Sequence, residues 1–439
     1  MSLIDATGHR VSGANPRGLA HYEQAAHELL CMVDDPAGSV DRAIAANPEL
    51  TMAHVLKAWM HLLGTEPAGI EVARACCAAA TVLDADARER GHLEAAQALA
   101  AGRWQAAALR LEDVSARYPR DTLALQVGHQ IDFFRGDARM LRDRIARALP
   151  AWDPSMPGWH AVLGMHAFGL EETGDYAAAE VQGRRSVELE PRDSWGWHAV
   201  AHVHEMRNAP RDGIAWLEPT RATWSNGSFL GTHNAWHLAL CHLELDRHDE
   251  VLRLYDEAIG GTGSAVVLDL IDASAMLWRL HLRGVALGAR PAAIAERWSA
   301  HGAGGSYAFN DLHAMIAYVL AERPREQQAL LDAQQAALQS DVDNAAFTRD
   351  VGHPATLAVQ AFGAGDFRRA AALLRPIRSI AHRFGGSHAQ RDLLDLTLLA
   401  AADRAADRAL AAALAAERSA SRPNSPDARR AAARWRIPS

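Results

Sequence analysis

The sequence has few of the residues that build disulfide frameworks or membrane spans. It contains four cysteines in 439 residues, and none of them forms a CxxC pair. Few and scattered cysteines are typical of proteins from reducing compartments. No window approaches the run of about 18 apolar residues that a membrane helix needs, and the first residues, MSLIDATGHRVSG, lack a signal-peptide pattern. We therefore expect a cytoplasmic protein with no membrane partner.

An excess of basic residues is also lacking. Acidic residues outnumber basic ones by 53 to 45, the net charge is -8, and Lys57 is the only lysine. Nonspecific nucleic-acid binding depends on a basic surface, so we expect no nucleic-acid partner. No Gly-rich phosphate loop, GxSxG elbow or HExxH zinc-protease helix is present either. These absences exclude the commonest nucleotide, serine-hydrolase and metalloprotease sites.

Alternating strand patterns are rare as well, and helical patterns take their place. Ala, Leu, Arg and Glu dominate, and apolar residues recur at three- and four-residue spacing. Gly, Pro, Asp or Asn interrupts these patterns at short intervals, which predicts many short amphipathic helices. Such a succession of short helices is typical of a repeat protein.

A repeated turn signature supports this interpretation. Segments 102–119 and 174–191 both begin with Gly, carry Ala five residues later and close with Pro, and Gly365 with Ala370 repeats the first spacing. In a tetratricopeptide unit of about 34 residues, Gly ends the first helix, Ala lets the two helices approach, and Pro stops the second helix. Degenerate turns at Asn208, Asp246 and near Glu322 continue the series.

The sequence therefore predicts an all-α fold, a right-handed α-solenoid superhelix of about nine or ten tetratricopeptide-like helix pairs. Residues 1–40 are expected to form an N-terminal entry and capping helix, residues 41–418 the solenoid, and residues 419–439 a basic, partly ordered tail. Residues 258–306 contain glycine-rich stretches that read as loops around one helix pair.

Histidines recur at the position of the first helix that faces the concave side of such an array. The segment WGWHAVAHVHEM places His198 and His202 four residues apart, and THNAWHLALCH does the same for His233 and His237. Residues four apart share one helix face. Since the first helices of adjacent units lie side by side, the two pairs could converge within metal-ligand distance.

From this pattern we assign candidate roles to the polar and aromatic residues on the predicted inward face. The candidate metal ligands are His198, His202, His233 and His237, with Glu205 and Asp272 as further catalytic candidates, and Asp272 is expected to orient one imidazole. The candidate ligand-binding residues are Trp197, Asn234, Trp236, Asn310, His313, Gln390, Arg391 and Asp392. The alternative is structural: the histidines could form a hydrogen-bonded polar layer, and the tryptophans could be interlocking core.

Ordered motifs also carry a resemblance to a known family. The motifs TMAHVLKAWMHLLGT, WHAVAHVHEM, THNAWHLALCHLE, FNDLHAM, TRDVGHPATLAVQAF, GGSHAQRD and RPNSP occur in this order between residues 51 and 426. In these motifs the chain resembles the tetratricopeptide repeat protein 38 family. The resemblance implies an all-helical repeat fold but no particular reaction. His353 and His388 depart from the family pattern, so the resemblance implies no role for them.

Two hypotheses about function follow. In the first, the concave pocket binds a small polar molecule. The protein would then be a hydrolase or oxygenase that uses zinc or iron, or an enzyme that works by acid–base catalysis. In the second, the groove is a protein–protein interaction scaffold that binds a peptide segment. The sequence leaves the substrate, the reaction and the oligomeric state open.

Overall fold

The computed structural model describes residues 3–435 and is helical almost throughout. In this part of the chain the only strands are β1 (Leu3–Ile4) and β2 (Arg10–Val11), which pair antiparallel. None of the helices in this range combines the length and the apolar character that a membrane span requires. The chain folds as two compact units, and the division between them falls within one helix, after Val200.

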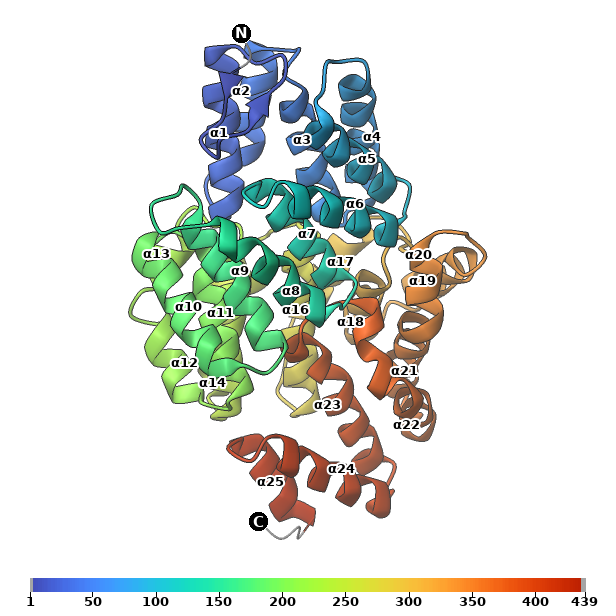
Figure 1. The fold of residues 1–439 in the computed structure, drawn as a ribbon. Coiled ribbons are helices and arrows are strands. Elements are labelled where there is room, and N and C mark those ends of the chain that lie inside the picture. The colour runs from blue at the N-terminus through green and yellow to red at the C-terminus, as the bar shows by residue number, and fades with distance from the viewer. Residues whose placement is uncertain (1–2, 436–439) are drawn as a thin grey trace. The chain divides into compact units, whose positions relative to one another are not determined.

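Unit 1 comprises the residues up to Val200 together with Ala222–Gly231. Its helices pack as successive antiparallel pairs, each of which also packs against the next pair (Figure 1). These helices are α1 (Pro16–Cys31), α2 (Pro36–Ala46), α3 (Thr51–Leu63), α4 (Pro67–Thr81), α5 (Ala87–Ala100), α6 (Trp104–Arg117), α7 (Thr122–Phe134), α8 (Ala138–Ala148), η1 (Leu149–Ala151), α9 (Trp159–Glu172), α10 (Tyr176–Leu189), the first part of α11 (Ser194–Met206) and α13 (Arg221–Ser225).

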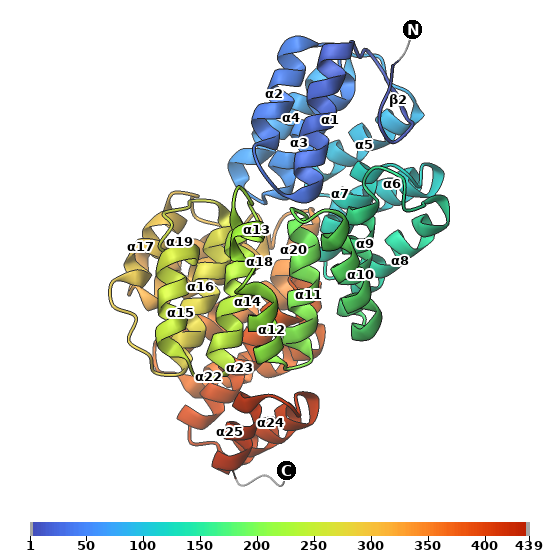
Figure 2. The same cartoon turned by 90° about the vertical axis from the view of Figure 1, so that its left-hand side faces the viewer.

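Unit 2 comprises Ala201–Arg221 and the residues from Thr232 onward. It continues the same pairing with the rest of α11, which lies beside α14 (Figure 2). The other elements are α12 (Pro210–Leu217), α14 (Gly231–Glu244), α15 (His248–Leu254), η2 (Tyr255–Ile259), α16 (Val267–Leu282), α17 (Arg290–Ser299), α18 (Ala308–Leu320), α19 (Pro324–Ala337), α20 (Asp343–Phe347), η3 (Thr348–Gly352), α21 (His353–Gly363), α22 (Phe367–Leu374), η4 (Arg375–Phe384), α23 (His388–Arg404), α24 (Arg408–Ser421) and α25 (Pro426–Trp435).

The helix pairs confirm the predicted all-α solenoid, and the predicted turns show why it forms. Gly102, Gly174 and Gly365 have φ values of 76°, 89° and 79°, the left-handed conformation that glycine adopts without steric cost. The degenerate turns use the same conformation at Asn208, Asp246 and Glu322. In the turn after α3, Thr65 is the left-handed residue, whereas Gly64 has φ -67°.

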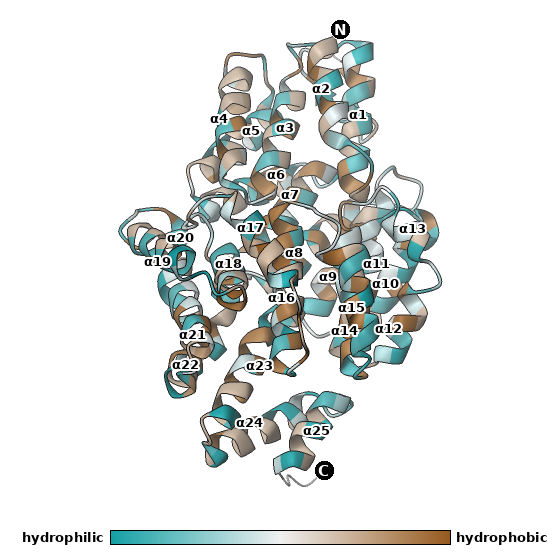
Figure 3. Cartoon of the chain, turned by 180° about the vertical axis from the view of Figure 1, so that it is seen from behind, coloured by the Kyte–Doolittle hydropathy of each residue, from teal (hydrophilic) through white to brown (hydrophobic). Residues whose placement is uncertain are grey.

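The small residue of the second helix is buried, as the repeat pattern predicts. Ala107, Ala179 and Ala370 each have 0% of their surface exposed. A larger side chain would separate the two helices of the pair. Individual helices such as α8 carry both hydrophobic and hydrophilic residues (Figure 3). The buried residues of α8 recur at spacings of three and four residues, from Leu141 to Ala148, so burial of one face drives its packing.

In unit 2 the chain also returns on itself. α16 packs against α17 and α18 and, more than 100 residues later, against α23. Trp278 on α16 donates a hydrogen bond to the Thr397 hydroxyl at 2.8 Å, and its ring contacts Phe362. Two helices that are far from α16 in sequence, α21 and α23, therefore contact Trp278.

The predicted domain boundaries at residues 40/41 and 418/419 fall inside α2 and α24. The predicted tail contains the end of α24 and all of α25 as far as Trp435. The remainder of that tail, residues 436–439, lies outside the described residues. The predicted loops around one helix pair in 258–306 are found on either side of α16 and α17.

Candidate metal centre

The first helices of two successive pairs, α11 and α14, carry the candidate centre. His202 on α11 and His233 and His237 on α14 belong to unit 2. His198 lies one turn before His202 on the same continuous helix. Each helix has histidines at i and i+4, so both project their imidazoles from a single face.

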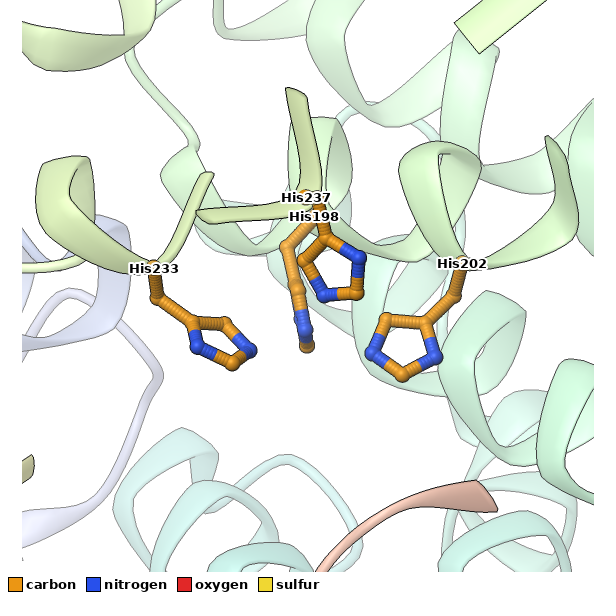
Figure 4. Close-up of side chains that lie close together, drawn as sticks. All are labelled: His198, His202, His233 and His237. Carbon is orange, nitrogen blue, oxygen red and sulfur yellow. The ribbon is translucent and has the colours of Figure 1, made fainter. Parts of the chain in front are cut away.

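The imidazoles come together as the spacing predicts. One possible ligand nitrogen from each of His198, His202, His233 and His237 lies within 4.8 Å of the others. The ring centroids of His202 and His237 are 4.4 Å apart, and those of His233 and His237 are 4.9 Å apart. Figure 4 shows the four rings pointing from their helices into the same space. Tetrahedral zinc with Zn–N bonds of 2.0–2.1 Å would need nitrogens about 3.4 Å apart, a spacing within reach of small side-chain rotations.

Asp272, on α16, holds one of these rings. Its Oδ2 atom lies 2.8 Å from Nδ1 of His233, and only 2% of the residue is exposed. This contact makes Nδ1 the protonated nitrogen and leaves Nε2 of His233 with its lone pair. In metal sites, a ligating histidine commonly donates its other ring N–H to a carboxylate in this way. The structure therefore brings Asp272 to the imidazole, as the sequence analysis expects.

The environment of His237 favours the neutral imidazole, the form that binds metals. Burial lowers the pKa of His237 well below its usual value, and the neighbouring His202, His233 and Arg279 lower it further. His202 and His237 are almost completely buried, whereas the His233 side chain is 16% exposed. His233 thus marks the side of the centre that is nearest to solvent.

Trp236 and Arg279 form a wall beside the histidines. The Trp236 ring stacks on His233 with centroids 5.4 Å apart and meets His237 edge-on at 5.0 Å. The guanidinium carbon of Arg279 lies 5.2 Å from the Trp236 ring centroid, a cation–π contact. Trp236 was expected in the site, but Arg279 was missed. An arginine inside the apolar stretch ASAMLWRLHL was the available signal, because buried arginines need a specific partner.

Arg279 is buried with spare hydrogen-bonding capacity. Its Nη2 donates to the Ala389 carbonyl at 2.7 Å, while Nη1 has no acceptor among residues 3–435. Burial lowers the pKa of Arg279 to about 10, although the nearby Asp392 and Glu205 act in the opposite direction. The group remains charged at neutral pH. A buried guanidinium with a free N–H is suited to hold an anionic group.

The predicted residues of α18 are buried near this arginine. His313 is 1% exposed, and its Nδ1 contacts the Phe309 carbonyl at 2.8 Å. Burial lowers the pKa of His313 to about 4, and the charge of Arg279 contributes to the decrease. Asn310, one turn earlier, is 8% exposed. His313 is therefore neutral at physiological pH.

Other candidates take part in structural contacts. Gln390 closes a helix-capping box with Ser387, and Arg391 donates to the Gly386 carbonyl. The Trp197 indole nitrogen donates to the Pro191 carbonyl at 2.9 Å, and Asn234 is fully buried on α14.

Asp392 and Glu205 belong to a buried ion-pair network in unit 2. Asp392 accepts two hydrogen bonds from Arg418, at 2.8 and 3.0 Å. Glu205 accepts from Arg422 at 3.2 Å, and Arg422 also lies 3.9 Å from Asp392. Glu205 follows His202 by three residues, but its carboxylate is engaged by the C-terminal arginines. These two acidic residues therefore join α11 and α23 to the C-terminal segment.

Comparisons with known proteins do not identify a family for this chain. None of the known protein-family models matches the chain. Among solved structures, the chain is similar to the crystal structure of the TPR domain of P58(IPK), with 16% sequence identity over 89% of this chain and 98% of that chain and a TM-score of 0.20. At so low a TM-score the match carries no argument about the site. The tetratricopeptide-like fold rests on the helix pairs and turns described above.

Proposed function

We propose that this protein is a helical-repeat scaffold that binds a divalent transition metal, zinc or iron, and acts on a small anionic molecule. His202, His233 and His237, with His198 on the preceding turn of α11, would be the ligands. The observation that supports this proposal best is the meeting of imidazoles from two helices, one of them held by the buried carboxylate of Asp272. In the tetratricopeptide repeat protein 38 family, which the chain resembles, these motifs would carry the same centre.

A metal bound here would supply Lewis acidity and a lowered pKa of bound water, the requirements of hydrolysis. The protein's own residues would do the rest. Asp272 keeps Nδ1 of His233 protonated and so presents Nε2. Arg279 offers its unused Nη1 to an anionic group, and Trp236 supplies an apolar wall beside it. His313, which is neutral and lies close enough to feel the charge of Arg279, would be available to hydrogen-bond the bound molecule.

The packing of unit 2 favours a small ligand over a peptide. An extended peptide needs a continuous open groove along the first helices. Around α16, however, contacts with α23 fill the interior: Arg279 reaches the Ala389 carbonyl and Trp278 reaches Thr397. Trp278 is fully buried. This side of α16 is therefore occupied by the protein's own side chains, although a peptide scaffold remains one outcome of the test.

Elemental analysis of the full chain, purified without chelators, tests the proposal. We expect His202→Ala/His237→Ala to lose one equivalent of metal relative to the unaltered chain, because two ligands are removed. His248→Ala is the matched control, since His248 lies on α15, outside the cluster, and is expected to keep the metal.

Less than about a tenth of an equivalent of any transition metal in the unaltered protein would refute the metal centre. Co-purification of one stoichiometric protein partner, lost in His198→Ala/His233→Ala, would favour the scaffold instead.

A further inference from the structure

A second cluster of metal-ligand side chains lies in unit 1, remote in sequence from the four histidines. His27 and Cys31 occupy positions i and i+4 of α1, and His160 is the second residue of α9. One ligand atom from each lies within 4.8 Å of the others. The Cys31 sulfur is 3.8 Å from Nε2 of His27, and the two imidazole centroids are 6.2 Å apart. In the sequence, the four-residue spacing of His27 and Cys31 is the local signal for this cluster, and His160 is brought in by tertiary packing.

Packing within unit 1 fixes the end of α1 where this cluster lies. α1 ends at Cys31 and is followed by Met32 in a left-handed conformation. The Met32 carbonyl accepts a hydrogen bond from the Phe229 amide at 3.2 Å, and the Leu29 carbonyl accepts one from Gln126 of α7 at 2.7 Å. The cluster therefore rests on an anchored helix end.

His160 is held by a carboxylate in the same manner as His233. Its Nδ1 lies 2.7 Å from Oδ2 of Asp193. Asp193 in turn accepts hydrogen bonds from the Ser186 hydroxyl at 3.0 Å and from the backbone amides of Trp195 and Gly196 at 3.1 Å. Because Asp193 is fixed by three donors, it keeps Nδ1 of His160 protonated and leaves Nε2 for another partner.

We infer that His27, Cys31 and His160 form a second transition-metal site of the zinc type, with Asp193 as its outer carboxylate. Zn–S bonds of about 2.3 Å and Zn–N bonds of about 2.05 Å place sulfur and nitrogen about 3.6 Å apart in a tetrahedron. The observed separation of Cys31 and His27 is 3.8 Å. Three protein ligands leave the fourth position open, as in catalytic zinc sites.

Burial distinguishes this site from a cysteine nucleophile. Cys31, His160 and Asp193 are the residue types of a nucleophilic triad, but only 1% of Cys31 is exposed, so a substrate carbonyl has no approach to the sulfur. His27 is exposed and His160 is half-buried. A single ion can therefore enter beside His27 and reach the thiol.

Cobalt(II) titration of the full chain, reduced and stripped of metal, tests this inference. Coordination of Cys31 produces a thiolate-to-cobalt charge-transfer band in the near ultraviolet that saturates at one equivalent. Cys31→Ala loses the band, whereas Cys241→Ala, which removes another buried thiol outside the cluster, retains it. His27→Ala weakens cobalt binding at this site at least tenfold, and since His27 is exposed, this variant keeps the fold.

The same titration separates the two sites. Imidazoles alone give no thiolate band, so His202→Ala/His237→Ala leaves the band unchanged and lowers only the total metal bound. Three results would each overturn the second site: no band in the unaltered chain, a band that survives Cys31→Ala, or unchanged cobalt affinity in His27→Ala. None of these results bears on the four-histidine centre.

Discussion

Asp311 on α18 gives the folded protein a pH dependence that can be worked out from the structure. The carboxyl is 2% exposed, and its only hydrogen-bond donors among the described residues are the Gly305 amide at 2.9 Å and Gln334 at 3.3 Å. Burial raises the pKa of Asp311 from 3.8 to about 7. With no cation beside it, the carboxyl is favoured in its neutral form by the apolar surroundings.

The sign of the effect follows from linkage. The folded-state pKa is raised, so the extra stability is fully present below pH 3.8 and is lost as the pH rises through 7. Between these values the folded state binds one more proton than the unfolded state, and stability falls by about 1.4 kcal/mol per pH unit. From pH 5 to pH 7.5 this amounts to about 2.5 kcal/mol, because the slope flattens near pH 7.

Urea unfolding at fixed pH measures this contribution. We expect the free energy of unfolding of the unaltered chain to decrease by about 2.5 kcal/mol relative to Asp311→Asn between pH 5 and pH 7.5, because the amide cannot ionise. The difference between the two proteins cancels the titration of other groups. Asp332→Asn is the control, since Asp332 is exposed on α19. A difference that stays constant within about 0.5 kcal/mol across this range would refute the argument.

Three further predictions follow from single contacts. Asp272→Asn should weaken metal binding by about 10- to 100-fold without unfolding the protein, since it removes the carboxylate that orients His233. A chelator-competition titration measures the metal affinity, and an unchanged affinity would contradict this prediction. Gly174→Ala should lower the free energy of unfolding by about 1 kcal/mol, because φ is +89° at this turn although the space around the new Cβ is open. A lower midpoint of urea unfolding would show this loss of stability. Arg144→Met should destabilise the protein by about 3 kcal/mol, because the buried Asp132 loses its ion pair at 2.7 Å and keeps, among the described residues, only Arg135 at 3.6 Å, and Arg144→Met/Asp132→Asn should recover part of the loss.

The fold could be predicted because its information is local. Gly102, Gly174 and Gly365 mark the turns, and Ala107, Ala179 and Ala370 mark the close approaches, within a few residues of each other in sequence. A turn needs only a residue that tolerates positive φ, so degenerate turns at Asn208, Asp246 and Glu322 could be located as well.

The meeting of the histidines on α11 and α14 could also be predicted from nearby residues, because an i,i+4 spacing on neighbouring first helices brings the rings to one face. Contacts between residues far apart in the chain could not be predicted in this way. Arg279 reaches Ala389, 110 residues away, and Arg422 reaches Glu205, 217 residues away. Nothing in either local sequence specifies these contacts.

The sequence by itself therefore determined that this is an all-helical array, where its turns lie and which histidines share a helix face. Only the tertiary structure decided which imidazole Asp272 holds, and that Arg279 meets Trp236 and His160 meets His27 and Cys31. The physical reason is that helical periodicity fixes the direction of a side chain relative to its own helix. The partner that it meets depends on how later helices pack back onto earlier ones.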